Sequence, residues 1–70
     1  MEIINISKDS ELLIPFKDSD VKIIIENCKV FITDISKGNK EIYVNNAELE
    51  YCYIKDSDTN GNNIIKINHK

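Results

Sequence analysis

Short runs of Ile, Val, Tyr and Phe recur along this chain, and clusters of Asp, Ser, Asn and Gly separate them. β-Branched and aromatic residues in short runs bounded by turn-forming residues are typical of β-strands. We expect residues 1–70 to form a single domain, because a chain of 70 residues is too short to bury two cores. The sequence therefore predicts a small all-β protein with strands over residues 2–6, 11–16, 21–26, 28–35, 41–45, 48–55 and 64–68.

Alternation of apolar residues within the runs predicts which side chains face the core. Val21, Ile23 and Ile25 share one face of a strand, and so do Ile65 and Ile67. After Asn27 the apolar residues move from odd to even positions, namely Cys28, Val30 and Ile32. A bulge or a tight corner at Asn27 would keep both sets facing inward.

The order of the strands allows more than one architecture. We expect a small antiparallel meander or a partly closed barrel of about six to seven strands, in which Gly38 supplies the positive φ of a tight turn. A weak repeat starting at residues 4, 23, 42 and 65 instead indicates a short parallel β-solenoid of three to four coils. A third interpretation is an α+β fold with a helix near 46–54, because Asn46 can cap a helix there.

Composition and charge narrow the classes of function. The net charge is −3 and every basic residue is Lys, so the chain lacks the positive surface and the Arg side chains with which proteins bind nucleic acids. We expect no direct nucleic-acid binding. We also expect no membrane insertion, because no apolar run approaches the roughly 20 residues that cross a bilayer. The residues Met1–Asn5 do not resemble a secretion signal, which favours a cytoplasmic location.

The segment Asp56-Ser57-Asp58-Thr59-Asn60-Gly61 resembles the start of the calcium loop of EF-hand proteins. The resemblance implies that Asp56, Asp58 and Asn60 are metal ligands, with Gly61 at the kink of the loop. It stops after these six residues, because Ile67 stands where the loop needs a bidentate acid. An ordinary exposed turn is the main interpretation, and calcium is the only cofactor that the sequence suggests.

The side chains that could support catalysis are scarce. The single His is His69, next to the last residue, and the two glycines form no phosphate-binding loop. Cys28 and Cys52 lie in expected strands, where free thiols act as small apolar residues. We therefore expect no enzymatic activity.

Recognition of another protein remains as the leading hypothesis. The segment 43–53 combines tyrosines, which are common at interfaces, with carboxylates. Its predicted binding residues are Tyr43, Glu48, Glu50, Tyr51 and Tyr53. We expect a small acidic accessory or inhibitory protein, of the phage or mobile-element type, that occupies a surface of a larger protein. The alternative is a calcium-stabilised β-module that binds saccharide or self-assembles, and a homo-oligomer fits either hypothesis.

Overall fold

The computed structural model describes residues 1–16, 18–54 and 64–70. Its strands are β1 (Glu2–Ile6), β2 (Ser10–Ile14), β3 (Val21–Glu26), β4 (Lys29–Asp34), β5 (Lys40–Asn45), β6 (Glu48–Tyr53) and β7 (Ile65–His69). This result confirms seven short strands at the predicted places. The helix considered near 46–54 is wrong, because β6 occupies that segment. The described residues include no helix with the length and apolar character needed to cross a membrane.

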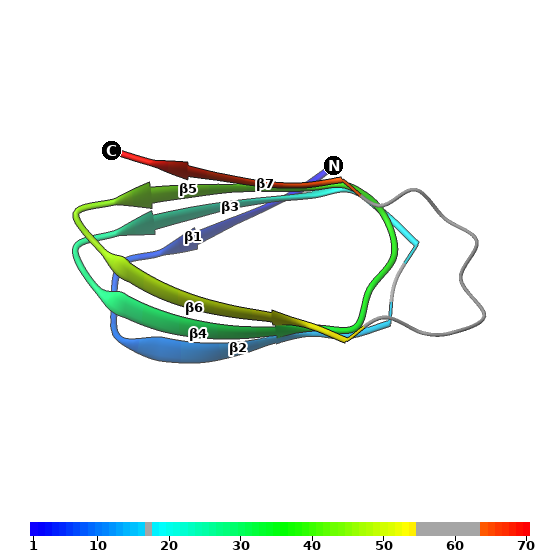
Figure 1. Ribbon diagram of the computed structural model, residues 1–70, viewed down its shortest axis with the longest axis horizontal. Helices are drawn as coiled ribbons and strands as arrows, with labels where there is room; N and C mark the ends of the chain where they lie inside the picture. Colours follow the sequence, from blue (N-terminus) through cyan, green and yellow to red (C-terminus); the bar gives the residue numbers. More distant parts are fainter. Residues whose placement is uncertain (17, 55–63) are drawn as a thin grey trace.

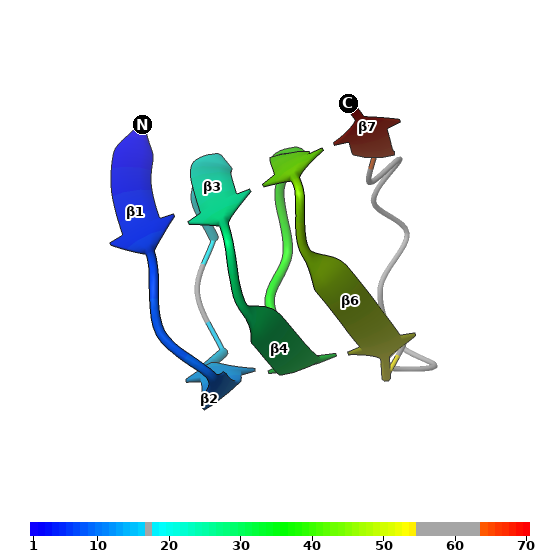
Figure 2. The same cartoon turned by 90° about the vertical axis from the view of Figure 1, so that its left-hand side faces the viewer.

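The strands form two sheets in which every neighbouring pair is parallel. One sheet has the order β1-β3-β5-β7 and the other has the order β2-β4-β6. Figures 1 and 2 show that the chain passes from one sheet to the other after each strand, so that strands adjacent in sequence face each other across the interior. The antiparallel meander and the partly closed barrel are therefore wrong. The arrangement fits a solenoid-like fold, in which each coil places one strand in each sheet.

The weak repeat in the sequence corresponds to real strand pairing for its first three members. Ile4 pairs with Ile23, and Ile23 pairs with Ile42, a spacing of 19 residues each time (4, 23 and 42). The fourth member is shifted, since Ile42 pairs with Ile67 and not with Ile65. The spacing between paired residues grows from 19 to 25 (42 to 67) because the connection before β7 is longer. Residues 54–64 separate β6 from β7, whereas residues 35–39 separate β4 from β5.

The core lies between the two sheets and consists mainly of β-branched side chains. Ile23, Ile25 and Ile42 are 0 % exposed, as the alternation in the sequence predicts. Burying each such side chain stabilises the fold by about 1.5–3 kcal/mol. Ile67 differs, because 40 % of its surface is exposed although its strand position matches that of Ile42.

Asparagines form two of the three corners that lead from the four-stranded to the three-stranded sheet. Asn27 has a φ of 56° and Asn46 has a φ of 50°, which confirms the tight corner predicted at Asn27. Asparagine adopts this left-handed conformation more readily than most residues. The Asn46 Nδ2 donates a 2.8 Å hydrogen bond to Asn27 Oδ1, so successive corners are stacked.

The opposite corners depend on a glycine and on side chains that link one coil to the next. Gly38 has a φ of 107°, and a Cβ at this position would lie 2.3 Å from the carbonyl oxygen of Ser19. The Asp20 carboxylate accepts a 3.0 Å hydrogen bond from the backbone N–H of Asn39. In turn, Asn39 Oδ1 accepts one of 3.2 Å from the N–H of Ile64. Gly38 thus takes the positive φ expected of it, but in an arch between sheets instead of a hairpin.

Candidate functional site

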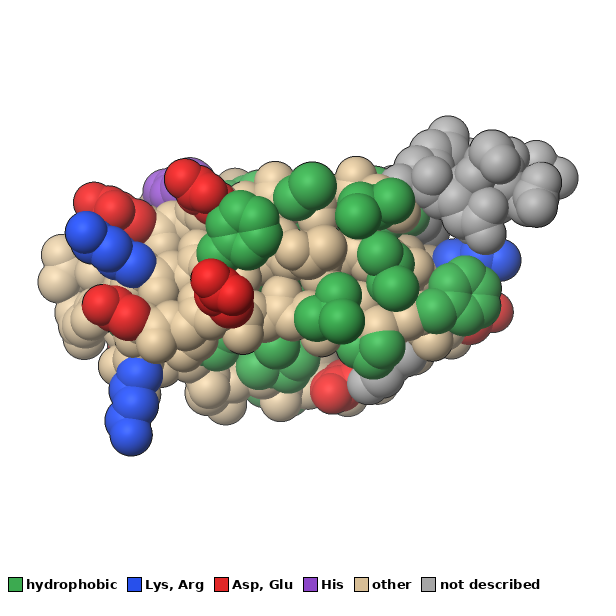
Figure 3. Space-filling model, turned by 90° about the horizontal axis from the view of Figure 1, so that it is seen from below, with side chains coloured by type: hydrophobic (Ala, Val, Ile, Leu, Met, Phe, Trp, Pro, Cys, Tyr) green, Lys and Arg blue, Asp and Glu red, His purple; other side chains and the backbone are tan. Residues whose placement is uncertain are grey.

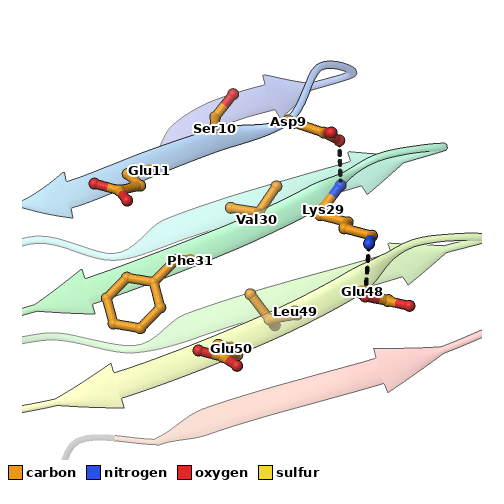
Figure 4. Close-up of a pocket in the computed structure, with 9 residues that line it drawn as sticks. All are labelled: Asp9, Ser10, Glu11, Lys29, Val30, Phe31, Glu48, Leu49 and Glu50. Carbon is orange, nitrogen blue, oxygen red and sulfur yellow. Dashed lines mark hydrogen bonds and ion pairs between the residues drawn. The ribbon is translucent and has the colours of Figure 1, made fainter.

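The outer face of the three-stranded sheet carries an exposed phenyl ring between two carboxylates. Phe31 in β4 pairs with Glu11 in β2 on one side and with Glu50 in β6 on the other. Because the side chains of these paired residues point away from the core, they form one row across the sheet (Figure 4). The ring of Phe31 is 41 % exposed.

The exposed apolar surface continues from this row toward the ends of the same strands. The next row consists of Leu13, Thr33 and Cys52, which pair in register. Leu13 is 60 % exposed, and Ile54 beyond β6 is 54 % exposed. Seen from this side, hydrophobic side chains cover much of the face, while charged ones gather at the opposite end (Figure 3). We call the surface formed by Glu11, Leu13, Phe31, Glu50, Cys52 and Ile54 the outer face.

The charged end of the same sheet is mainly acidic. Lys29 Nζ lies 3.8 Å from the Glu48 carboxylate, and both side chains are exposed. The backbone N–H of Lys29 donates a 2.8 Å hydrogen bond to Asp9 Oδ1. Asp9 and Glu48 line the same shallow hollow as Glu11 and Glu50, so four carboxylates and one lysine line this hollow. This part of the sheet therefore has an excess of negative charge.

The outer surface of the four-stranded sheet has a different character. Lys22, Glu41 and Lys66 follow one another across neighbouring strands, so that opposite charges alternate. Tyr43 lies among them, with Lys22 Nζ 5.1 Å from the centre of its ring. Its hydroxyl also donates a 3.3 Å hydrogen bond to Glu41. The charges and the tyrosine on this surface thus already interact with one another.

A cluster of polar side chains lies inside the protein, at the corner between β4 and β5. Asp34, Ser36 and Lys40 are at most 1 % exposed. The Asp34 Oδ1 accepts hydrogen bonds of 2.8 Å from the backbone N–H of Ser36 and 2.6 Å from its hydroxyl. Lys40 Nζ donates a 3.1 Å hydrogen bond to the carbonyl oxygen of Ser36. The buried cluster is thus internally satisfied, which is what burial of charged groups requires.

Two tyrosines of β6 complete this buried cluster. The Tyr51 hydroxyl donates a hydrogen bond to Asp34, and the Tyr53 hydroxyl donates one of 3.1 Å to the carbonyl oxygen of Ser36. Burial raises the pKa of Tyr51 far above its ordinary range, and the hydrogen bond to Asp34 and the nearby charges act in the same direction. Lys40 Nζ lies 5.2 Å from the centre of the Tyr53 ring. These contacts give the cluster a structural role.

The structure separates the five predicted binding residues into three places. Glu48 and Glu50 lie on the exterior of the three-stranded sheet, Tyr51 and Tyr53 point inward to the buried cluster, and Tyr43 lies on the four-stranded sheet. They do not form one site. Sequence reasoning missed Phe31 and Glu11, although the alternation that turns Val30 and Ile32 inward also turns Phe31 outward.

The predicted calcium ligands Asp56, Asp58 and Asn60 lie outside the described residues. Within residues 1–16, 18–54 and 64–70, no three His, Cys, Asp or Glu side chains are grouped as a metal site would need. Cys28 and Cys52 are free thiols, the first buried and the second exposed.

Searches against protein-family models, curated proteins and solved structures return no match for this chain.

Proposed function

We propose that this chain is a non-enzymatic interaction module that binds a larger protein through the outer face. The observation that carries the proposal is the row Glu11–Phe31–Glu50, in which an exposed aromatic ring is flanked by two carboxylates. Occupying a surface of the larger protein in this way would make the chain an accessory or inhibitory factor.

The apolar part of the outer face supports a protein partner. Protein interfaces typically have an apolar or aromatic centre, where water is excluded, and a polar rim. Phe31 and Leu13 supply such a centre, and Glu11 and Glu50 supply part of the rim. A strand surface held by parallel neighbours is also rigid, so little conformational entropy is lost on binding.

The charges support a partner whose contact surface is basic. Four carboxylates and one lysine line the hollow on this sheet, and negative charge of this kind repels nucleic acid. Complementary Lys or Arg side chains on the partner would accelerate association at low salt. The expected partner surface is an apolar socket for Phe31 with basic residues around it.

The experiment starts with capture from a lysate of the source cells, using the tagged chain and two variants. Phe31→Ser removes the aromatic centre, and Glu11→Lys combined with Glu50→Lys reverses the charge of the rim. We expect both variants to lose a protein that the unaltered chain captures. The captured protein is then purified and titrated directly, and the association rate is measured at low and at high salt.

A matched control lies on the other sheet. Tyr43→Ser removes an aromatic side chain of comparable exposure from a surface outside the proposed interface. We expect it to bind the partner with unchanged affinity. If Tyr43→Ser abolishes binding while Phe31→Ser does not, the outer face is not the interface and the proposal is wrong.

A further inference from the structure

The two sheets have unequal numbers of strands, and in the described residues each sheet ends at a strand with an open edge. The sheet containing β7 has four strands, and the sheet facing it has three, ending at β6. Among the described residues, no strand pairs with the second edge of β6 or with the second edge of β7. Figure 2 shows β7 and β6 at the same end of the molecule, where each is the last strand of its sheet.

The inner side of β7 carries isoleucines, as a core strand does, but these side chains are less buried than core residues. Ile67 pairs with Ile42, which is 0 % exposed, yet Ile67 itself is 40 % exposed. Ile65 pairs with Lys40, which is also fully buried, and Ile65 is only partly buried. A strand placed beside β6 would cover both isoleucines and would pair with the open edge of β6.

A second copy of this chain can supply that strand from its own β7. Figure 1 shows that the strands of the two sheets run in opposite directions, so a rotation of 180° about an axis parallel to the strands brings the second β7 beside β6. In this position the second β7 runs antiparallel to β6. The same rotation brings the first β7 beside the second β6, so each copy fills the vacant position of the other, as a twofold interface requires.

The strand positions fix which residues would meet. Residues of β5 and β6 that are equally far in sequence from the corner 46–47 lie at the same height, meaning the same position along the strand axis. Ile42 is therefore level with Tyr51. Since Ile42 pairs with Ile67, Lys66 is level with Cys52 and Lys70 is level with Glu48. A rotation about an axis along the strands preserves these heights. Lys66 of the second copy would then lie beside Cys52, and its Ile67 would face Ile67 of the first.

The charges of the two strands are complementary in this arrangement. On their outward sides β7 carries Lys66 and β6 carries Glu48 and Glu50, with Lys70 following β7. Lys70 of the second copy would be level with Glu48, and its Lys66 would be diagonal to Glu50. Opposite charges on neighbouring strands stabilise strand pairing.

Head-to-tail stacking of copies does not fit equally well. The other end of the molecule presents β1 and β2 side by side, one in each sheet. If β1 of a second copy paired with β7, the position beside β6 would remain empty and Ile67 would remain uncovered. The twofold arrangement fills that position with the strand already present.

We propose that two copies of this chain form a twofold dimer in which β7 of each copy pairs antiparallel with β6 of the other. Each resulting sheet contains seven strands, four from one copy and three from the other. The outer faces of the two copies then lie on opposite sides of the dimer, where each remains accessible. The dimer does not depend on the function proposed above.

The decisive test is a register-specific cross-link in the full chain. Lys66→Cys places a second thiol on β7, level with the natural Cys52 of the other copy. Directly paired residues in antiparallel strands have Cα separations of about 4.5–5.5 Å, which suits a disulfide. Mild oxidation should convert the variant to a covalent dimer on a non-reducing gel, and Lys66→Cys with Cys52→Ser should stay monomeric on that gel.

Asn68→Cys is the matched control, because it lies on the same side of β7 but level with Glu50 instead of Cys52. We expect no more than about a tenth of the cross-linked product that Lys66→Cys gives, since diagonal neighbours are about 7–8 Å apart. Equal cross-linking by the two variants would show random collision and would overturn the proposed register.

Solution mass tests the association without cysteine chemistry. The chain of 8.1 kDa should sediment as a dimer at concentrations near 100 µM, and Ile67→Asp should shift it to the monomer while its circular dichroism stays unchanged. Ile3→Asp, on exposed Ile3 in β1 at the other end, should leave the dimer intact. A monomeric unaltered chain, or a series of masses that grows with concentration, would overturn the proposal.

Discussion

The Nζ of Lys40 lies 3.4 Å from Oδ2 of Asp34, and both side chains are fully buried. Each charge loses its hydration inside the protein, and the attraction between them offsets that loss only while both are present. Ser36 and Tyr51 add hydrogen bonds to the same carboxylate. The pair therefore joins the corner after β4 to the start of β5 and to β6.

Removing the cation alone should destabilise the protein strongly. In Lys40→Met the Asp34 carboxylate stays buried without its counter-ion, and we expect the free energy of unfolding to fall by about 3–5 kcal/mol. Thermal unfolding followed by circular dichroism measures the effect. Adding Asp34→Asn to Lys40→Met removes the uncompensated charge and should restore part of the loss. If the double variant is less stable than Lys40→Met, the charge is not the cause.

The buried phenol of Tyr51 predicts a loss of stability at alkaline pH. Burial and the hydrogen bond to Asp34 raise its pKa in the folded protein above the ordinary value of 10.0. Above pH 10 the unfolded chain releases this proton and the folded chain keeps it, so the stabilisation is complete below pH 10 and declines as the pH rises further. Urea titrations at pH 9 and pH 11 should show a smaller decline for Tyr51→Phe than for the unaltered protein. An equal decline in both would contradict the assignment.

Gly38 should be intolerant of any side chain. In Gly38→Ala the added Cβ would lie 2.3 Å from the Ser19 carbonyl oxygen, and the backbone φ of 107° is unfavourable for alanine. We expect a loss of about 1–3 kcal/mol in the free energy of unfolding. Asn46→Gly is the control, because at its φ of 50° glycine removes one hydrogen bond and relieves backbone strain. The midpoint of thermal unfolding should shift far less for Asn46→Gly than for Gly38→Ala.

The two cysteines should differ in reactivity. Cys28 is 8 % exposed and its thiol donates to the Ile6 carbonyl oxygen at 3.7 Å, whereas Cys52 is exposed on β6. A disulfide reagent that releases a coloured product should modify one thiol per folded chain. It should modify the second thiol only in denaturant. Cys52→Ser should abolish the reaction of the folded protein. Rapid reaction of both thiols without denaturant would be inconsistent with this structure.

Local sequence predicts the strands of this protein well and their partners poorly. The runs around Ile23 and Ile42 are β-branched and alternate, and this local pattern is enough to place β3 and β5. The same pattern is produced whether the following corner makes a hairpin or carries the chain to a facing sheet. Asn27 marks a corner in either case, so in the sequence only the weak repeat at residues 4, 23 and 42 indicates the parallel pairing of residues 19 positions apart, which the structure shows.

The buried polar cluster could not be predicted from the sequence. Asp34 falls near the end of the predicted strand 28–35, whereas Ser36 and Lys40 flank a predicted turn at Gly38, where polar side chains are expected to be exposed. Their burial depends on Tyr51 and Tyr53, which approach from a strand whose pairing is not encoded locally. The outer face was partly predictable, since the exposure of Glu50 follows from alternation in β6.

Each early strand of this protein finds its hydrogen-bonding partner two strands later, and this order determines how the chain can fold. β1 pairs with β3 and β2 pairs with β4, so no sheet can begin before one complete coil has closed and the first strand of the next has joined it. The loop-closure entropy of the first coil therefore opposes the β1–β3 pairing before any sheet exists, whereas β5 and β6 add to edges that already exist. Folding should accordingly resemble the growth of a short polymer, with a slow nucleus of two coils followed by rapid addition of the third.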